Sequence, residues 1–589
     1  MTTSVDGVVP RQSMAACRSS AAALSRSTVA VVVLFQCAML MMVCVLIGDN
    51  GWDDGAITLA YARTFARHGR VALTPQSEIV EGFSSVSWFL LNSLVARARP
   101  SFRLTITIAQ ALSVVSIASC TALLARTCAL LRLDKLFSLL TLIAVAAWGC
   151  SFSEAGNAME MGLLGAACLV IVNELLSSQP SLPLLCGGVV LAVTTRCEAI
   201  LYVGLLGLSV VSVPGRRAFW AIVLTAAATV ALLSAWRLAV FSDIVPNTVW
   251  AKRWPPYAAF SLGDRLAGGM ELLSFFLVPF LALASARRFR LTLVATLRTR
   301  RQSLAIVSAP VVGAVLMGIV MGRHWGYYGR MQYFASPIAL LLLSLLLSQW
   351  VAAEGSGYRL MSAACALASA VGTSMVVGFP VASLRAASGG GAFSVSPHTY
   401  AESGDVFRRF AAAADLVHAS ILTPDVGGLA LCCDELKIVD LAFLSNRKLA
   451  QEGLAAIPQV LAAEQPDLAE VHWKWTEVPK LYELPAFERH YAPAFAGGTR
   501  LWIRRDLADR IARSGRGCWV PLRREDVRWA VQEDRYATTE VPYDRSSFER
   551  LGTMFALDQE EPGHANLCRR STQGTTEVRQ PHGSARPTL

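Results

Sequence analysis

Charged residues are scarce in this sequence: Asp, Glu, Lys and Arg make up only 16% of its 589 residues, whereas hydrophobic residues make up 54%. A soluble protein of this length does not need so much apolar sequence to fill a core. Runs of about 20 apolar residues, the length of a helix that crosses a bilayer, recur along the first two thirds of the chain. The composition therefore predicts a polytopic α-helical membrane protein.

Several motifs are also missing. The 14 cysteines include no CxxC pair, which argues against a zinc site, and there is no RNP, zinc-finger or helix-turn-helix pattern. The net charge of +11 is therefore interpreted as loop charge that faces the anionic lipid of the bilayer, with no nucleic-acid partner. Most cysteines lie in apolar runs, where they act as small hydrophobic residues. In the polar C-terminal third, one expected disulfide joins Cys432 or Cys433 to Cys518.

The segment 28–47 is interpreted as a first membrane span, because it is too long for a signal peptide and no small-residue cleavage site follows it. Arg11, Arg18 and Arg26 precede it, so residues 1–27 are predicted to be cytoplasmic. The apolar stretch from Phe83 is short and is predicted to lie at the outer interface or to re-enter. If it crossed instead, the basic loop 287–301 would face outwards, against the positive-inside rule.

About eleven crossings follow from this scheme. They are expected at 28–47, 105–124, 136–148, 159–176, 182–194, in a sixth span that ends near 213, and at 219–240, 270–285, 304–321, 334–350 and 361–380. The loops with unusual polar motifs then share the outer face, opposite the Arg-rich loops; they are 53–81, 151–160, 196–198, 242–252 and 323–330. A common face for scattered polar motifs indicates one assembled site.

The composition changes near residue 384, so 28–383 is predicted to be the transmembrane domain, with its first outer loop at 49–82. In "SILTPDVGGLALCCDELKIVDLAFLS", short β-branched runs alternate with Pro, Gly and Asp. A C-terminal extracytoplasmic α/β domain is therefore expected at 384–551. The polar, Pro- and Gly-rich tail 552–589 is predicted to be disordered.

Two adjacent carboxylates, Asp53 and Asp54, follow the first apolar run, with Arg63 and Glu81 nearby in the same loop. One carboxylate can accept the proton of an attacking hydroxyl group. Guanidinium groups, or a metal ion held by the second carboxylate, can stabilise a departing phosphate. The alternative is that the two Asp residues only cap a helix that begins near Gly55. The spacing alone favours neither.

The stretch "WDDGAITLAYARTFARHGRVALTPQSEIVEGFSSVSWFLL" resembles the first periplasmic loop of GT-C glycosyltransferases, above all the actinobacterial group that contains the mycobacterial terminal arabinofuranosyltransferase. Four later stretches are similar to loops of that family: "NAMEMGLLGA", "TTRCEAI", "SDIVPNTVWAK" and "GRHWGYYGRMQYFASPIALLL". His324 departs from the pattern, because the family usually has Asp there. "DVGGLALCCDELKIVDLAFLSNRKLA" is similar to part of the family's soluble domain, and the resemblance covers roughly residues 50 to 505.

The resemblance implies an inverting transferase of a cell inner or plasma membrane. It moves a sugar, arabinofuranose being one candidate, from a polyprenyl phosphate to an envelope glycan or glycolipid. Asp53 or Asp54 would be the general base, and the other would hold the acceptor or a divalent cation (Mg, Mn or Ca). The residues expected to bind the donor phosphate are Arg330, Arg196, Lys252 and Arg63. Those expected to contact the substrates are Glu81, Glu160, Glu198, Asn247, His324, Trp325, Tyr327 and Tyr328.

Each assignment has a structural alternative. Arg330 and Lys252 are also typical of basic side chains that snorkel to the interface at the ends of spans. Glu160 and Glu198 can also be structural residues that only pair with Arg196. The aromatic residues 325–328 fit an interfacial belt. Two other function classes stay open: a transporter or flippase for a lipid-linked sugar, and a non-catalytic envelope protein that binds glycan. A transporter predicts charges near the midplane and two matching halves, whereas the polar groups here lie at span ends.

Overall fold

The computed structural model describes most of the chain, and the chain divides into two compact units. The described residues are 23–211, 217–254, 257, 261–322, 328–353, 357–379, 396–470, 481, 484–496, 499–521, 552–558 and 568. The helical unit comprises Met1–Ala401 together with Asp425–Asp434 and Phe443–Gln451. The sheet unit comprises Glu402–Pro424, Glu435–Ala442 and Glu452–Leu589. Two short segments of the predicted outer domain thus group with the membrane helices.

Seven described helices of the helical unit are long and apolar enough to cross a membrane. They are α2 (Arg26–Ile47), α5 (Phe102–Leu130), α11 (Arg217–Phe241), α13 (Leu262–Ser285), α15 (Arg301–Met321), η1 with α16 (Arg330–Ala335 and Ser336–Ala352) and α17 (Gly357–Val377). An eighth span results if the bent pair α6 (Lys135–Ala146) and α7 (Gly149–Gly156) is counted as one. The prediction of a polytopic helical membrane protein is confirmed.

The remaining expected crossings contain shorter apolar helices. These are α8 (Met161–Leu176), α9 (Leu182–Thr195) and α10 (Ala199–Ser209), of 16, 14 and 11 residues. The stretch from Phe83 forms α4 (Val86–Ala96), whose 11 residues rise only about 16 Å. Every expected crossing thus holds a helix, while length alone supports seven or eight spans among the described residues.

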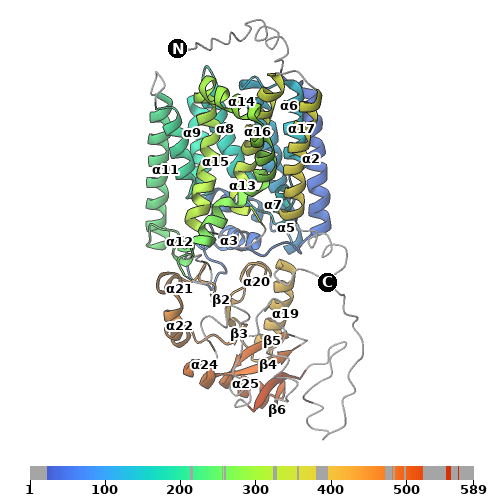
Figure 1. Cartoon of the computed structure of the whole chain (residues 1–589). Helices are drawn as coiled ribbons and strands as arrows, with labels where there is room; N and C mark the ends of the chain where they lie inside the picture. The colour runs from blue at the N-terminus through green and yellow to red at the C-terminus, as the bar shows by residue number, and fades with distance from the viewer. Residues whose placement is uncertain are drawn as a thin grey trace, which may run out of the picture. The chain divides into compact units, whose positions relative to one another are not determined.

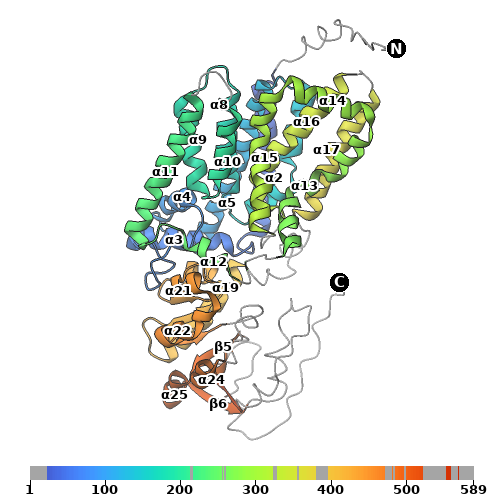
Figure 2. The same ribbon diagram turned by 60° about the vertical axis from the view of Figure 1, so that its left-hand side comes forward.

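The helices stand side by side in both views of the helical unit (Figures 1 and 2). Small residues allow close packing, as is usual between membrane helices. An added Cβ at Gly162 of α8 would lie 2.9 Å from Ile117 of α5, and one at Gly165 would lie 3.0 Å from the Cys120 sulfur. On the outside of the bundle, apolar side chains such as Leu232 of α11 are left 72% exposed, as lipid-facing residues are.

The two ends of the helical unit differ in charge. The basic helix α14 (Arg287–Thr299) lies at one end, and α3 (Asp54–His68) and α12 (Asn247–Ala251) lie at the other (Figure 1). Arg300 donates a hydrogen bond of 2.7 Å to the carbonyl of Leu131, which places the basic turn between α5 and α6 at the α14 end. The described residues of the predicted polar loops also contact one another, since Asp54 pairs with Arg330 and Glu160 pairs with Arg196.

The sheet unit is built on a seven-stranded mixed sheet of order β2-β1-β3-β5-β4-β7-β6. The strands are β1 (Ser420–Thr423), β2 (Lys437–Asp440), β3 (Leu468–Ala469), β4 (Tyr491–Ala496), β5 (Thr499–Arg504), β6 (Gly517–Pro521) and β7 (Thr553–Leu557). Its helices are α22 (Ile457–Glu464), α24 (Pro485–His490), α25 (Arg505–Arg513) and the larger part of α19 (Pro397–Ala413). The expected C-terminal α/β region is confirmed.

Two expectations for this region are wrong. Thr553–Leu557 is not disordered but forms β7, between β4 and β6. Composition could not reveal this strand, because its partners come from far upstream. The disulfides also differ from the expected pairing, since Cys432 bonds to its neighbour Cys433, and Cys518 bonds to Cys568. Cys432 and Cys433 belong to the helical unit, whereas Cys518 belongs to the sheet unit.

Candidate functional site

Asp54 and Arg330 form the central ion pair of the candidate site. Asp54 is the first residue of α3, and Arg330 begins η1 directly after Gly329, whose φ of +75° turns the chain into it. The Arg330 Nη1 lies 2.5 Å from the Asp54 Oδ2. The Arg330 side chain is only 9% exposed, whereas that of Asp54 is 36% exposed. This carboxylate therefore offers a face to solvent or to a ligand, and the guanidinium holds it in place.

A second, fully buried arginine lies beside this pair. Arg196, which follows α9, places its Nη1 2.9 Å from Glu160 and its Nη2 2.6 Å from Glu198. Its Nη2 is also 3.9 Å from the sulfur of Met331, the residue after Arg330. Burial opposes the charge of Arg196, but Glu198 and Glu160 outweigh burial and raise the pKa of the guanidinium. Arg196 thus stays charged, with its fork held by two carboxylates.

Lys252 completes the group, which we call the acid–base cluster: Asp54, Glu160, Arg196, Glu198, Lys252 and Arg330. Burial, and then repulsion by Arg196, lower the pKa of Lys252 to about 8, and Glu198 opposes this shift. No hydrogen bond or ion pair joins its amine to another residue in the part of the chain that the structure describes. The cluster holds three cations and three carboxylates. Arg196 and Arg330 form ion pairs with these carboxylates, whereas no such ion pair of Lys252 is found among the described residues.

Asp53 points away from its neighbour Asp54. Its side chain is buried, and its oxygens accept hydrogen bonds from the backbone N–H groups of Gly427 (2.9 Å) and Gly428 (2.7 Å). These two glycines begin α20 (Gly427–Cys432). Burial, and then the nearby Asp425, raise the pKa of Asp53 well above its ordinary value. Asp53 therefore caps α20 and makes no side-chain cap to α3, contrary to the capping alternative for this residue.

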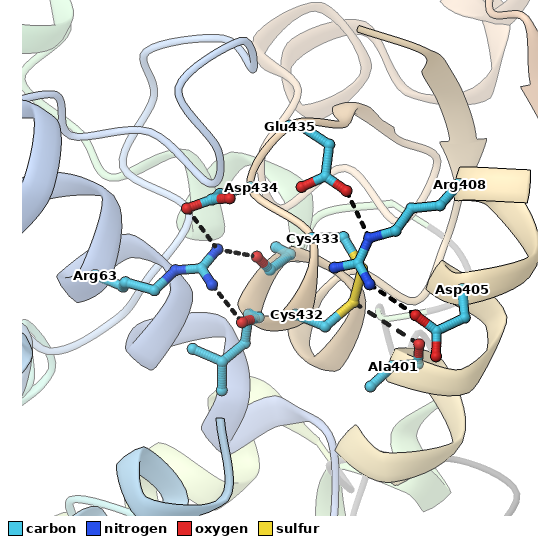
Figure 3. Close-up of a disulfide and its surroundings, with 10 residues drawn as sticks. Arg63, Ala401, Asp405, Arg408, Cys432, Cys433, Asp434 and Glu435 are labelled. Carbon is cyan, nitrogen blue, oxygen red and sulfur yellow. Dashed lines mark hydrogen bonds and ion pairs between the residues drawn. A yellow bond between two sulfur atoms is a disulfide. The ribbon is translucent and has the colours of Figure 1, made fainter. Parts of the chain in front are cut away.

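Arg63 also contacts α20 rather than the acid–base cluster (Figure 3). Its Nη1 donates a hydrogen bond of 2.5 Å to the carbonyl of Leu431, and its Nη2 donates one of 2.6 Å to that of Ala430. Asp434 lies 3.9 Å from Arg63 and 3.3 Å from Arg67. The fork of Arg63 is thus engaged on the last turn of α20, whereas the donor phosphate was expected at the acid–base cluster.

Two residues expected to contact substrate have other partners. Glu81 is 2% exposed and forms a bidentate ion pair with Arg237 of α11, at 2.6 and 3.0 Å. The side-chain amide of Asn247 donates to the carbonyls of Phe443 (3.0 Å) and Leu444 (2.8 Å). It thereby holds the segment Phe443–Gln451, which contains all but the last residue of α21 (Arg447–Glu452), on the helical unit.

Of the aromatic residues expected to contact the sugar, the structure describes Tyr328. The Tyr328 hydroxyl shares a hydrogen bond of 2.9 Å with Ser274, and its ring packs edge-on against Phe275, with centroids 5.6 Å apart. His324, Trp325 and Tyr327 lie outside the described residues. The contact with Ser274 ties Tyr328 to α13.

The carboxylates of this region do not fit a protein-held divalent cation. Both oxygens of Asp53 already accept backbone hydrogen bonds, and Asp54 is paired with Arg330. Within the described ranges, no group of three or more His, Cys, Asp or Glu side chains is placed to hold a metal ion. Mg²⁺ and Ca²⁺ require several oxygen ligands. We therefore derive no step through a metal ion.

Sequence reasoning overlooked two partners that matter here. Arg237 is a charged residue within an apolar helix, and such a charge usually has a buried partner. The sequence could therefore have predicted that Arg237 pairs with a carboxylate. The Gly427–Gly428 pair follows Asp425 in a stretch that was interpreted as part of the outer domain. Two successive glycines at the start of a short helix indicate a close backbone approach, which here is the approach to Asp53.

Comparisons with known proteins give little. No family model matches this chain, and no curated protein matches it. Among solved structures, the chain is similar to ArnT from Cupriavidus metallidurans bound to undecaprenyl phosphate. The identity is 14%, the match covers 80% of this chain and 97% of that chain, and the TM-score is 0.46. The function of this chain must therefore be argued from its own residues.

Proposed function

We propose that this protein is a membrane glycosyltransferase of the GT-C type, which moves a sugar from a polyprenyl phosphate to a hydroxyl group of an envelope glycan or glycolipid. One observation carries the proposal: the acid–base cluster lies at one end of a bundle of apolar helices. A donor with a lipid tail needs an apolar bundle, and its phosphate needs cations at the end of that bundle. The resemblance of the first loop supports arabinofuranose as the sugar.

The chemistry follows from the cluster. The acceptor oxygen attacks the anomeric carbon, the bond from that carbon to the phosphate oxygen breaks, and the polyprenyl phosphate leaves with the electron pair, so the configuration inverts. The hydroxyl proton passes to Asp54, the exposed carboxylate of the pair. Arg330 and Lys252 stabilise the charge of the departing phosphate. Arg196, held by Glu160 and Glu198, adds a fixed positive charge beside them.

Two independent features support an extracytoplasmic position for the cluster. The basic α14 end of the helical unit is opposite, and basic loops are enriched on the cytoplasmic side. The Cys432–Cys433 disulfide closes α20, which contacts α3 at the cluster end, and disulfides persist in oxidising compartments. This orientation puts the N-terminus in the cytoplasm and the site on the outer face of the inner or plasma membrane.

The test uses the full chain in lipid nanodiscs with a panel of polyprenyl-phosphate sugars and an arabinan or glycolipid acceptor. Release of polyprenyl phosphate and formation of a glycosidic product are both measured. The wild type should form product with one donor, and Asp54→Asn should abolish it. Asp415→Asn is the matched control, because Asp415 also pairs with an arginine, Arg516, at 2.5 Å, but on the surface of the sheet unit.

Three results would overturn the proposal. One is full activity in Asp54→Asn. Another is an equal loss of activity in Asp415→Asn, which would remove the link to the acid–base cluster. The third is movement of the lipid-linked sugar between leaflets with no glycosidic product, because that result identifies a transporter.

A further inference from the structure

We propose that Asp53 is a positioning residue that fixes α20 on α3 and thereby holds Asp54 in place for the reaction. The inference deepens the proposed function and rests on it. It divides the two adjacent carboxylates into different roles: Asp54 faces the acid–base cluster, whereas Asp53 faces the segment Asp425–Asp434 from the C-terminal part of the chain.

Asp53 satisfies the N-terminal end of α20. The first N–H groups of a helix have no partner within the helix, and a carboxylate there is favoured by the helix dipole. Asp53 supplies one oxygen to Gly427 and the other to Gly428. The approach is close enough to require glycine, since an added Cβ at Gly427 would lie 2.6 Å from the Asp53 Oδ2 and 2.5 Å from its carbonyl oxygen.

Arg63 and Asp434 hold the other end of the same short helix. Arg63 donates to the carbonyls of Ala430 and Leu431, and the Asp434 carboxylate lies near Arg63 (Figure 3). Asp434 is also 3.3 Å from Arg67. α3 and the residue that precedes it thus hold α20 at both ends, with a carboxylate at its N-terminus and guanidinium groups at its C-terminus. A helix of six residues is not stable by itself, so its order depends on these contacts.

The residues on either side of Asp54 connect it to α20. The start of α3 is held on one side by Asn157, because the Trp52 N–H donates a hydrogen bond of 2.6 Å to the Asn157 Oδ1. Gly55 packs against the same residue, and an added Cβ there would lie 2.2 Å from the Asn157 carbonyl oxygen. α20 provides the support on another side through Asp53. Asp54 lies between these fixed residues, and a shift of about 1 Å at a reacting group can lower a rate about 100-fold.

Asp53 itself is not placed to act as the general base of the transfer. Its side chain is buried, with both oxygens engaged by backbone N–H groups. An acceptor hydroxyl would have to displace α20 to reach it. Asp54, 36% exposed, needs no such displacement.

The kinetic test compares Asp53→Asn, Gly427→Ala and the double variant. Each single change should lower kcat by about 10- to 100-fold through misplacement of Asp54, with the KM for the lipid donor unchanged. The double variant should be no worse than the poorer single one, since both changes break one contact. The fall in rate at acid pH, which reports protonation of the base, should persist in the residual activity of Asp53→Asn, because Asp54 is still present. The inference would be overturned if the kcat losses of the two single variants multiplied in the double variant. It would also be overturned if Asp53→Asn no longer lost rate at acid pH.

A second measurement does not depend on turnover. Hydrogen exchange of the peptide that covers residues 427–434 should accelerate in Asp53→Asn and in Gly427→Ala, and should stay at the wild-type rate in Asp54→Asn and in the control Asp415→Asn. Unchanged exchange in Asp53→Asn would overturn the inference even if transfer is confirmed. If the wild type acts on no donor while exchange accelerates as stated, the proposed function fails and the contact between Asp53 and α20 stands.

Discussion

Asp54 and Arg330 are separated by 276 residues in the chain, yet their side chains form an ion pair with 2.5 Å between Oδ2 and Nη1. Asp54 comes from the helix after the first span, and Arg330 from the short η1 turn that leads into α16. The pair therefore joins an early and a late part of the helical unit. This long-range contact places a charged arginine, 9% exposed, beside a carboxylate that remains accessible.

We expect Arg330→Lys to lower kcat/KM by about 10- to 100-fold. Lysine keeps the charge but lacks the planar fork, and a hydrogen bond to a charged group contributes about 1.5–3 kcal/mol. The measurement is transfer from the active donor. Arg126→Lys is the matched control, because Arg126 pairs with Glu174 at 2.9 Å on helices α5 and α8, away from the cluster. Equal rates for wild type and Arg330→Lys would remove Arg330 from the site.

The depressed pKa of Lys252 gives a pH-dependence with a defined sign. Burial lowers this pKa to about 8, so the ammonium is charged below that pH and loses its proton as the pH rises through it. The affinity for a donor phosphate, which stays negative throughout, should therefore fall above about pH 8. Donor KM measured against pH should rise in this range for the wild type. Lys252→Arg should abolish the rise, because arginine stays protonated; a rise that persists in this variant would contradict the assignment.

The sequence was most informative where the bilayer imposes a rule. Long apolar runs must form helices, since no other open structure satisfies the backbone in lipid, and every expected crossing holds one. The positive-inside rule also grouped the polar loops correctly at one end, so that Asp54, Arg196, Lys252 and Arg330 could be expected near one another. Their roles in transfer remain a prediction.

Partners chosen by the tertiary structure were out of reach. Arg63, Glu81 and Asn247 were all expected at the substrate, but their partners Leu431, Arg237 and Phe443 lie 368, 156 and 196 residues away. No local pattern encodes such contacts. The adjacent Asp53 and Asp54 look equivalent in the sequence, and only the position of α20 distinguishes them.

Loss of the Cys518–Cys568 disulfide should destabilise the edge of the sheet unit. The bond joins β6 to a residue beyond β7, at a sequence separation of 50 residues, and the chain-entropy model gives about 4 kcal/mol for a loop of this size. Hydrogen exchange in β6 and β7 should accelerate in the Cys518→Ser/Cys568→Ser variant, and in the wild type under reducing conditions. Free thiols at both positions in protein isolated under non-reducing conditions would contradict the bond, and with it the predicted extracytoplasmic location of this unit.

The buried pair Glu81–Arg237 provides a test of stability that is independent of catalysis. Burial raises the pKa of Glu81 above its ordinary value, and the hydrogen-bonded Arg237 offsets part of that rise. Arg237→Met removes that compensation and leaves a buried carboxylate alone, which should cost about 3–5 kcal/mol. We expect a clear fall in the melting temperature of the detergent-solubilised chain. Arg516→Met is the control, because Arg516 and its partner Asp415 are 44% and 74% exposed, so the loss of this surface pair should change the melting temperature less.

The variant Arg237→Met should also show a pH-dependence of its stability. In Arg237→Met the folded pKa of Glu81 should lie above its unfolded value, so the variant gains stability when the carboxyl is protonated and loses it as the pH rises. Its melting temperature should therefore increase as the pH is lowered from about 8 towards about 5. The double variant Glu81→Gln/Arg237→Met carries no charge at this place and should lack this gain. A gain of equal size in the double variant would show that other groups cause it.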